Sequence, residues 1–273
     1  MPLAWQGGPV CGRYAASRNP DDLVEEFEVE WVDVKERLEP DWNVAPTKDV
    51  YAVVQRKPRG EDVPENADPV RQLRVVRWGL VPSWAKDPSI GSRLINARME
   101  TVAEKPAFRR AFSARRCLLP ADGYYEWYAP EGSDFEPPRS GGKTRKQPFF
   151  ITPRDGGVLA MAGLYEFWRD PKAADDDANA WLVTCSVLTT DAEDSLGRIH
   201  DRMPLLVERE RWAEWLDPKL SDPDRLTGLL VPAAPGRLEA YPVSTLVNDV
   251  RNNGPELVDP VPLEEEADAA TLF

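Results

Sequence analysis

The sequence has few cysteines and almost no histidine, which argues against several kinds of site. Cys11, Cys117 and Cys185 are its only cysteines, no two of them form a CxxC pair, and His200 is its only histidine. An odd number of widely separated cysteines indicates neither a disulfide framework nor a zinc site. We therefore expect no metal and no cofactor, and a cysteine with a special role should act as a nucleophile.

Long apolar runs are also absent. No stretch approaches the roughly 18 apolar residues of a membrane span, and residues 1–10 have neither the basic start nor the apolar core of a signal peptide. We expect a cytoplasmic protein with no membrane partner. The hydrophobic content of 42%, with 9% aromatic residues, is enough for a buried core in a chain of 273 residues.

Positive charge is in short supply. The chain has 34 Lys and Arg residues against 47 Asp and Glu residues, a formal net charge of −13, which on its own argues against a nucleic-acid partner. The charge is unevenly distributed, however, because acidic residues concentrate in segments 21–30, 175–177 and 264–268. A locally basic groove on an acidic body is compatible with this pattern.

Runs of β-branched and aromatic residues outnumber helical patterns. Strands are predicted at 51–55, 73–78, 117–119, 124–128, 148–152, 158–168 and 181–189. Helices are predicted at 21–28, 101–115, 208–216 and 222–230. Polar segments at 57–68, 130–146 and 170–178 are expected to be surface loops rather than linkers between domains. The fold class is therefore α+β, a single domain with a mainly antiparallel sheet.

Seven short motifs carry a family resemblance. Cys11-Gly12-Arg13-Tyr14 is followed by WNVAPT at 42–47, RWGLVPSW at 77–84, NARMET at 96–101, FRRAF at 108–112, RCLLPADGYYEW at 116–127 and IHDRMP at 199–204. In this order the motifs resemble those of the SRAP family of abasic-site processing proteins. The resemblance extends from Cys11 to about residue 243. It divides the chain into a 1–10 extension, an SRAP domain at 11–245 and an acidic tail at 246–273.

The resemblance implies a fold, a partner and a set of site residues. It implies a curled, barrel-like sheet with peripheral helices and a groove for single-stranded DNA containing abasic sites, near replication forks or single-strand/double-strand junctions. A monomer active in the DNA damage and SOS responses is expected. The implied catalytic residues are Cys11 as nucleophile, Asn96, Glu126 as acid/base and His200.

Cationic and aromatic residues within the motifs, together with one asparagine, are the candidates for DNA contact. Arginines bind phosphates, and tryptophans stack on bases. The proposed DNA-binding residues are Arg13, Asn43, Arg77, Trp78, Trp84, Arg98, Arg109, Arg110 and Arg202. Core packing is the alternative for the two tryptophans, and a solvated surface charge is the alternative for each arginine.

An N-terminal cysteine is chemically suited to capture an aldehyde, and the open-chain form of an abasic deoxyribose is an aldehyde. The amine forms an imine, and addition of the thiol then closes a five-membered thiazolidine ring. An α-amino group, with a pKa of about 7.7, has a substantial neutral fraction at physiological pH, whereas a lysine with a pKa of about 10.4 does not. Opening the sugar ring requires proton transfer, for which a nearby carboxyl or imidazole is suitable.

Ten residues precede Cys11, although the family carries its cysteine directly after the initiator methionine. A thiazolidine cannot form on a nitrogen held in a peptide bond. We expect translation to begin at Val10, with the initiator methionine then removed. The alternative is self-cleavage between Val10 and Cys11, a hydrolase activity that the family resemblance also implies.

Other interpretations of these residues remain open. Cys11 is compatible with a buried structural cysteine, Glu126 with a solvent-facing strand residue, and Asn96 with a helix cap. At the level of function, one alternative is an N-terminal-nucleophile hydrolase or cysteine peptidase that uses Cys11 and His200. Another is a non-catalytic protein that shields single-stranded DNA.

Overall fold

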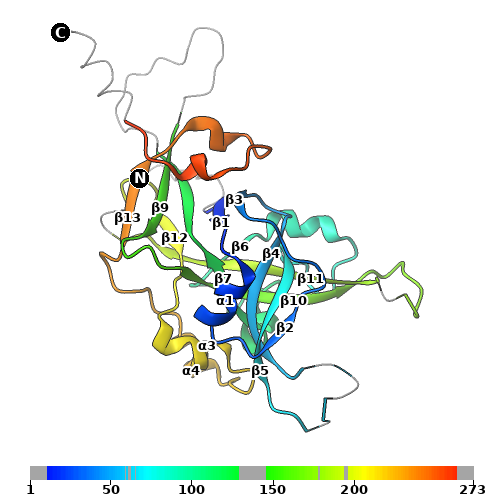
Figure 1. The fold of residues 1–273 in the computed structure, drawn as a ribbon. Helices are drawn as coiled ribbons and strands as arrows, with labels where there is room; N and C mark the ends of the chain where they lie inside the picture. The colour runs from blue at the N-terminus through cyan, green and yellow to red at the C-terminus, as the bar shows by residue number, and fades with distance from the viewer. Residues whose placement is uncertain are drawn as a thin grey trace, which may run out of the picture.

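Long strands form a curled sheet at the centre of the molecule, with short helices around it (Figure 1). The structure is a computed structural model and describes residues 11–58, 60, 63–64, 66–128, 146–177, 179–193 and 196–262. The larger sheet has the strand order β12-β11-β10-β7-β4-β5-β2. Its strands are β2 (Trp31–Asp33), β4 (Asp49–Arg56), β5 (Val70–Trp78), β7 (Arg116–Ala121), β10 (Leu159–Arg169), β11 (Trp181–Asp191) and β12 (Arg202–Pro204).

One parallel pairing closes five of these strands into a barrel. Strands β5, β4, β7, β10 and β11 are joined by antiparallel ladders, and β11 then returns to β5, pairing Thr184 with Arg77 and Cys185 with Trp78. Strand β6 (Asn96–Arg98) adds to β11 in parallel. The predicted barrel-like, single-domain α+β fold is confirmed.

A second sheet of five antiparallel strands lies beside the barrel. Its order is β13-β9-β8-β1-β3, formed by β13 (Leu238–Pro242), β9 (Gln147–Pro153), β8 (Gly123–Tyr128), β1 (Tyr14–Ala16) and β3 (Asp41–Val44). Residue Asp122 alone separates β7 of the barrel from β8 of this sheet, so the chain passes directly between them. Residues close to β8 are thereby held against the barrel.

The helices are short and begin at polar or proline signals. They are α1 (Pro20–Glu26), α2 (Arg109–Ala114), α3 (Trp212–Leu216) and α4 (Pro223–Gly228), with 3-10 turns η1 (Pro88–Arg93), η2 (Arg209–Arg211), η3 (Thr245–Asn248) and η4 (Pro255–Val258). Asn19 caps α1 by accepting from the Asp21 N–H, and Asp222 caps α4 in the same way. The prediction of a helix over 101–115 is wrong in its first half, which forms turns, because Pro106 removes a backbone donor inside that segment.

Alternate residues of β4 pack on two different sides, which explains where the core lies. Tyr51 and Val53 join a cluster that contains residues of all four helices, whereas Val50, Ala52 and Val54 join a second cluster. The second cluster includes Cys11, Tyr14, Tyr124, Cys117 and Cys185. All three cysteines are therefore inside the protein, on the side of β4 that faces the five-stranded sheet.

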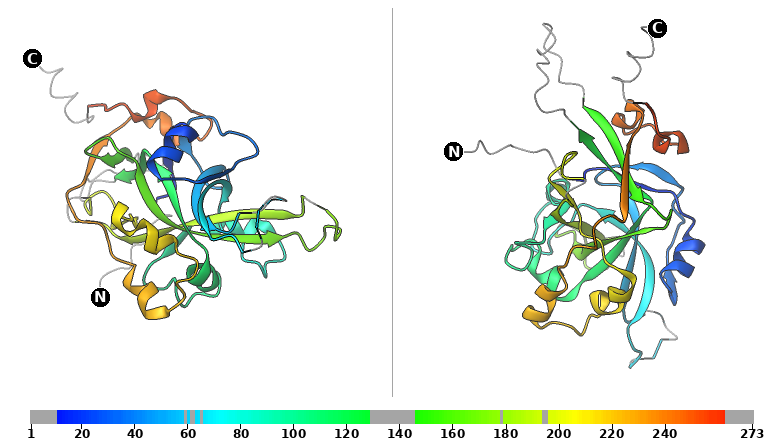
Figure 2. Two further views of the ribbon diagram at one scale, coloured as in Figure 1. Left: turned by 60° about the horizontal axis from the view of Figure 1, so that its bottom comes forward. Right: turned by 90° about the vertical axis from the view of Figure 1, so that its left-hand side faces the viewer.

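The segment after β13 packs on the five-stranded sheet, at the end of the molecule opposite α3 and α4 (Figure 2). Val247 and Leu257 are fully buried there, in turns η3 and η4. The predicted tail at 246–273 therefore begins with packed structure, and residues 263–273 lie outside the described part. No helix in the described part of the chain is long and apolar enough to cross a membrane.

Candidate active site

The backbone nitrogen of Cys11 meets the side chain of Glu126. The Cys11 N–H donates to Oε1 of Glu126 over 2.6 Å, and both residues are buried. The ladder between β1 and β8 produces this meeting, because Tyr14 pairs with Tyr124 and the Tyr125 N–H donates to the Arg13 carbonyl. Residues that are 115 positions apart in the chain are thus in direct contact.

Burial changes the proton affinity of both groups. Loss of water raises the pKa of Glu126 to about 8, with a further rise from Asp201, while the hydrogen bond from Cys11 and the charge of Lys146 oppose it. Burial and the neighbouring Glu126 carboxylate raise the pKa of the Cys11 thiol. Glu126 can therefore carry or release a proton near neutral pH, and the Cys11 thiol is uncharged.

His200 lies in the same electrostatic neighbourhood, because Asp201 and Lys146 act on it as they act on Glu126. Its Nδ1 accepts from the Arg202 N–H at 3.0 Å, and burial lowers the pKa of the ring. A backbone N–H can only donate, so the neutral ring carries its proton on Nε2. The Asp201 carboxylate, also 3.0 Å from Nδ1, is then not an ion-pair partner.

Asn96 begins β6, and its neighbour Ile95 packs in the cluster that contains Cys11. Its backbone pairs in register with Val187 of β11, so Asn96 belongs to a strand and does not cap a helix. The four predicted catalytic residues therefore come from the segment before β1, from β6, from β8 and from the loop before β12. The structure joins Cys11 directly to Glu126 and places His200 within the electrostatic range of the same charges.

The predicted DNA-binding arginines fall into two groups. Arg13 is partly buried and donates to the Asn43 side chain and the Val247 carbonyl. Arg202 is neutralised by Glu100 and Asp191. The other arginines of the set are exposed: Arg77, Arg98, Arg109 and Arg110. Their role in DNA contact stays a prediction.

Asn43 and the two tryptophans occupy different environments. Trp78 has no exposed surface, donates its indole N–H to the Ile95 carbonyl and packs edge-on against Tyr14, so it is a core residue. Asn43 is equally buried. In this conformation neither side chain presents a face to a nucleotide. Trp84, by contrast, is 60% exposed and available for stacking.

Two residues of this neighbourhood were absent from the sequence prediction, Tyr124 and Lys146. Tyr124 lies two residues before Glu126 in β8, so both side chains point to the same side of the sheet. The alternation of side chains along a strand could have indicated from the sequence that Tyr124 lies near Glu126. Lys146 lies at the end of a polar segment and had no signal, because its effect on Glu126 and His200 depends on the fold.

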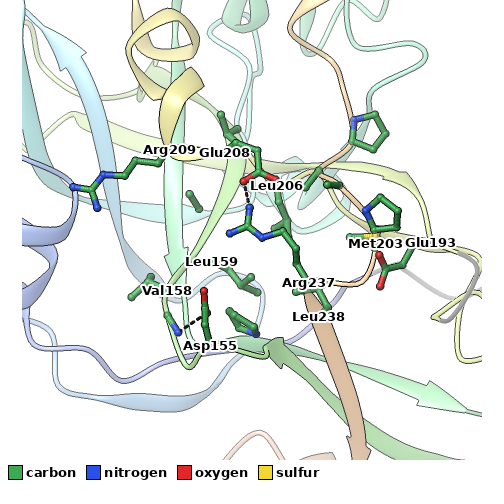
Figure 3. A pocket seen from close by; sticks show the side chains of 18 of the residues that line it. Asp155, Val158, Leu159, Glu193, Met203, Leu206, Glu208, Arg209, Arg237 and Leu238 are labelled. Carbon is green, nitrogen blue, oxygen red and sulfur yellow. Dashed lines mark hydrogen bonds and ion pairs between the residues drawn. The ribbon is translucent and has the colours of Figure 1, made fainter.

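The structure also contains a cavity of about 600 Å³ (Figure 3). Apolar side chains such as Leu159, Met203 and Leu206 line it, together with the ion pair between Arg237 and Glu208. None of the four predicted catalytic residues lines this cavity. The reaction site is therefore assigned from the contact between Cys11 and Glu126 and not from the cavity. Within the described residues there is no cluster of three or more potential metal ligands.

The fold and these contacts define a class: a single-domain barrel protein in which a buried cysteine adjoins a carboxyl with a raised pKa. Residues 10–250 match the family model described as SOS response associated peptidase (SRAP), and the chain belongs to this family. The resemblance drawn from the sequence motifs is confirmed.

Named relatives agree with this assignment, and a solved structure shares the fold. The chain is 38% identical over 250 residues to abasic site processing protein YoqW of Bacillus subtilis, covering 92% of this chain and 99% of that protein. It is 32% identical to abasic site processing protein HMCES of Gallus gallus, covering 83% of this chain and 68% of that protein. A Bacteroides thetaiotaomicron crystal structure superposes with a TM-score of 0.72 at 24% identity, covering 92% of this chain and all of that one.

Proposed function

We propose that the protein processes abasic sites in single-stranded DNA by capturing them covalently on Cys11. The names of its relatives support abasic sites as the target. The observation that carries the proposal is the contact of the Cys11 nitrogen with Glu126 Oε1 at 2.6 Å. In a chain that begins at Cys11, the same nitrogen is an amine held against an acid–base group.

The reaction is a condensation that releases one water. The Cys11 amine attacks C1 of the open-chain sugar to give a carbinolamine, and loss of the C1 hydroxyl as water gives an imine. The thiol then adds to the imine carbon, and its proton passes to nitrogen as the thiazolidine closes. Glu126 can accept a proton from the amine and return it to the leaving hydroxyl, because its pKa of about 8 is close to that of an α-amino group. We assign His200 and Asn96 to proton transfer and to positioning around the sugar.

The chemistry requires a free amine on Cys11. Translation that begins at Val10 supplies it directly once the methionine is removed. Self-cleavage is the alternative: the thiol attacks the Val10 carbonyl, Glu126 protonates the leaving nitrogen, and water hydrolyses the resulting thioester. The left-handed backbone of Cys11, with a φ of 44°, supports this second route because it places strain beside the bond that would break.

The experiment combines intact-mass analysis with crosslinking. Protein from its native source is expected to begin at Cys11 and to form a denaturant-resistant adduct with an abasic single-stranded oligonucleotide. Cys11→Ser should abolish the adduct while sparing non-covalent binding, because an oxygen analogue closes a less stable ring. Cys117→Ser is the matched control and should crosslink normally.

The outcomes separate the competing functions. Adduct formation by a protein that retains residues 1–10 would contradict the thiazolidine mechanism. Turnover of an amide substrate without an adduct would indicate a cysteine hydrolase. Binding that survives Cys11→Ser, with no covalent product from the unsubstituted protein, would indicate a DNA-shielding protein.

A further inference from the structure

Tyr124 carries a hydroxyl group whose position no packing requirement explains. The residue has no exposed surface, and its Oη has no hydrogen-bond partner among the described residues. A buried hydroxyl without a partner is destabilising, and a phenylalanine would fill the same space without that cost. The hydroxyl is therefore a candidate for a partner that arrives with the substrate.

Strand β8 places Tyr124 on the same face as Glu126. Tyr124 and Glu126 are two residues apart in β8 and share a face, while Tyr125 between them points to the other side. Tyr124 packs in the cluster that contains Cys11, whereas Tyr125 packs in a separate cluster and donates its hydroxyl to the Trp42 carbonyl. The two adjacent tyrosines thus differ in the side of the sheet on which they lie and in whether the hydroxyl is already bonded within the protein.

The charges that act on Tyr124 include those of the reacting groups. Burial raises its pKa, and Cys11, Glu126 and Glu193 each raise it further. The phenol therefore stays protonated at any pH at which the protein works. It can donate a hydrogen bond to an oxygen but does not serve as a base, a role that the neighbouring Glu126 fills.

We propose that Tyr124 is a further catalytic residue, whose hydroxyl donates a hydrogen bond to the C1 oxygen of the abasic sugar. This inference rests on the proposed function. The bond polarises the aldehyde while the Cys11 amine attacks and then holds the carbinolamine oxygen while Glu126 delivers the proton that releases it as water. No proton leaves Tyr124 permanently, so the condensation still releases one water.

The first test compares Tyr124→Phe with Tyr125→Phe, in protein that begins at Cys11. Removal of one preorganised donor from a developing oxyanion typically slows a reaction by about 10²- to 10³-fold, and for a neutral phenol we expect a loss of at least about tenfold in the single-turnover rate of adduct formation. Tyr124→Phe should melt at or above the wild-type temperature, because no bond within the protein is lost. Tyr125→Phe should crosslink at the wild-type rate and melt lower, because its bond to Trp42 is lost.

The second test does not depend on covalent chemistry. Two oligonucleotides are compared, one with the abasic sugar reduced to its C1 alcohol and one with a tetrahydrofuran analogue that lacks the C1 hydroxyl. Wild-type protein should bind the alcohol several-fold more tightly, and Tyr124→Phe should bind both equally. If the wild-type protein forms no adduct, the covalent proposal fails while this preference still reports on Tyr124. Wild-type crosslinking and an unchanged preference in Tyr124→Phe would overturn the inference.

Discussion

Glu126 acquires its chemical character from its surroundings. A glutamate in an aromatic strand is compatible with a solvent-facing residue, but here the side chain is 3% exposed and accepts from the Cys11 N–H. Burial raises its pKa to about 8, far above the ordinary value of 4.5. The sequence motif assigned Glu126 its place in the site, but the proton affinity comes from the depth at which β8 lies and was not predictable from the residue itself.

The raised pKa predicts how stability depends on pH. Folded protein keeps the Glu126 proton up to about pH 8, whereas the unfolded chain loses it near 4.5. The stabilisation is complete below the lower value and is lost as pH rises toward the upper one. The melting temperature of the 273-residue chain should therefore fall by several degrees relative to Glu126→Gln between pH 5 and 8, as each pKa unit corresponds to about 1.4 kcal/mol.

The comparison with Glu126→Gln isolates this group. His200, whose pKa is lowered by burial, acts in the opposite direction but is present in both proteins and cancels from the difference. In protein that begins at Cys11, the same substitution should slow adduct formation by about 10²- to 10⁴-fold with little change in DNA affinity. If the melting temperatures of the two proteins differ by the same amount at every pH from 5 to 8, Glu126 does not hold its proton in the folded state.

Secondary structure was predictable wherever a segment carried a long pattern. The seven predicted strands correspond to β4, β5, β7, β8, β9, β10 and β11, which are long enough to show buried β-branched and aromatic runs. The strands that were missed, β1, β2, β3, β6, β12 and β13, have only three to five residues. Their conformation is fixed by pairing with distant partners, so the local sequence carries little signal.

The segment around η3 shows how an element depends on one buried side chain. Asn43, on β3, donates its amide to the carbonyls of Val247, Asp249 and Asn252 and accepts from Arg13. The sequence analysis placed this residue of the WNVAPT motif among the DNA-binding candidates. The tertiary structure uses them internally and ties residues 247–252 to the chain next to Cys11.

Asn43→Ala should loosen this element. It removes one acceptor of the Arg13 guanidinium and one donor from three carbonyls, of which Val247 still accepts from Arg13 and Asp249 still accepts from the Asn252 N–H. The Asn252 carbonyl loses its donor, and an unsatisfied group of this kind costs about 1–3 kcal/mol, so we expect a loss of about 1–3 kcal/mol in unfolding free energy. Asn43→Asp should be worse, because it places an acceptor against three carbonyl oxygens. Chemical denaturation measures the loss, and backbone amides of η3 should exchange hydrogen faster.

The matched control for this prediction is Asn179→Ala, a change at an exposed position in the turn between β10 and β11. Surface substitutions of this kind usually stay within about 0.5 kcal/mol. If Asn43→Ala unfolds at the same denaturant concentration as Asn179→Ala, the amide does not hold the C-terminal segment in place.

Closure of the barrel determines the arrangement of the whole molecule. Strand β11 contacts β10 on one side and β5, β6 and β12 elsewhere along its length, so it connects the strand of Asn96 with the strand that follows His200. No local pattern indicated the parallel return of β11 to β5, which depends on the order of the strands in space. Gly79 lies directly after β5, at the point where β11 returns to β5, and its N–H donates to the Cys185 carbonyl.

Gly79→Ala should therefore destabilise the whole domain. The residue has a φ of 122°, and an added Cβ would lie 2.7 Å from the Gly91 carbonyl oxygen. Backbone strain of about 1–3 kcal/mol and this clash together should cost roughly 2–4 kcal/mol, or about 5–15 °C in melting temperature.

Two control substitutions separate the effect of backbone strain from the effect of the clash. Gly156→Ala also has a positive φ but an open environment, so it should show the strain alone, and Gly228→Ala in α4, with no neighbour within 4 Å and an ordinary φ, should be neutral or slightly stabilising. A Gly79→Ala protein that melts no lower than Gly156→Ala would show that the approach of Gly79 to Gly91 does not constrain the closed barrel.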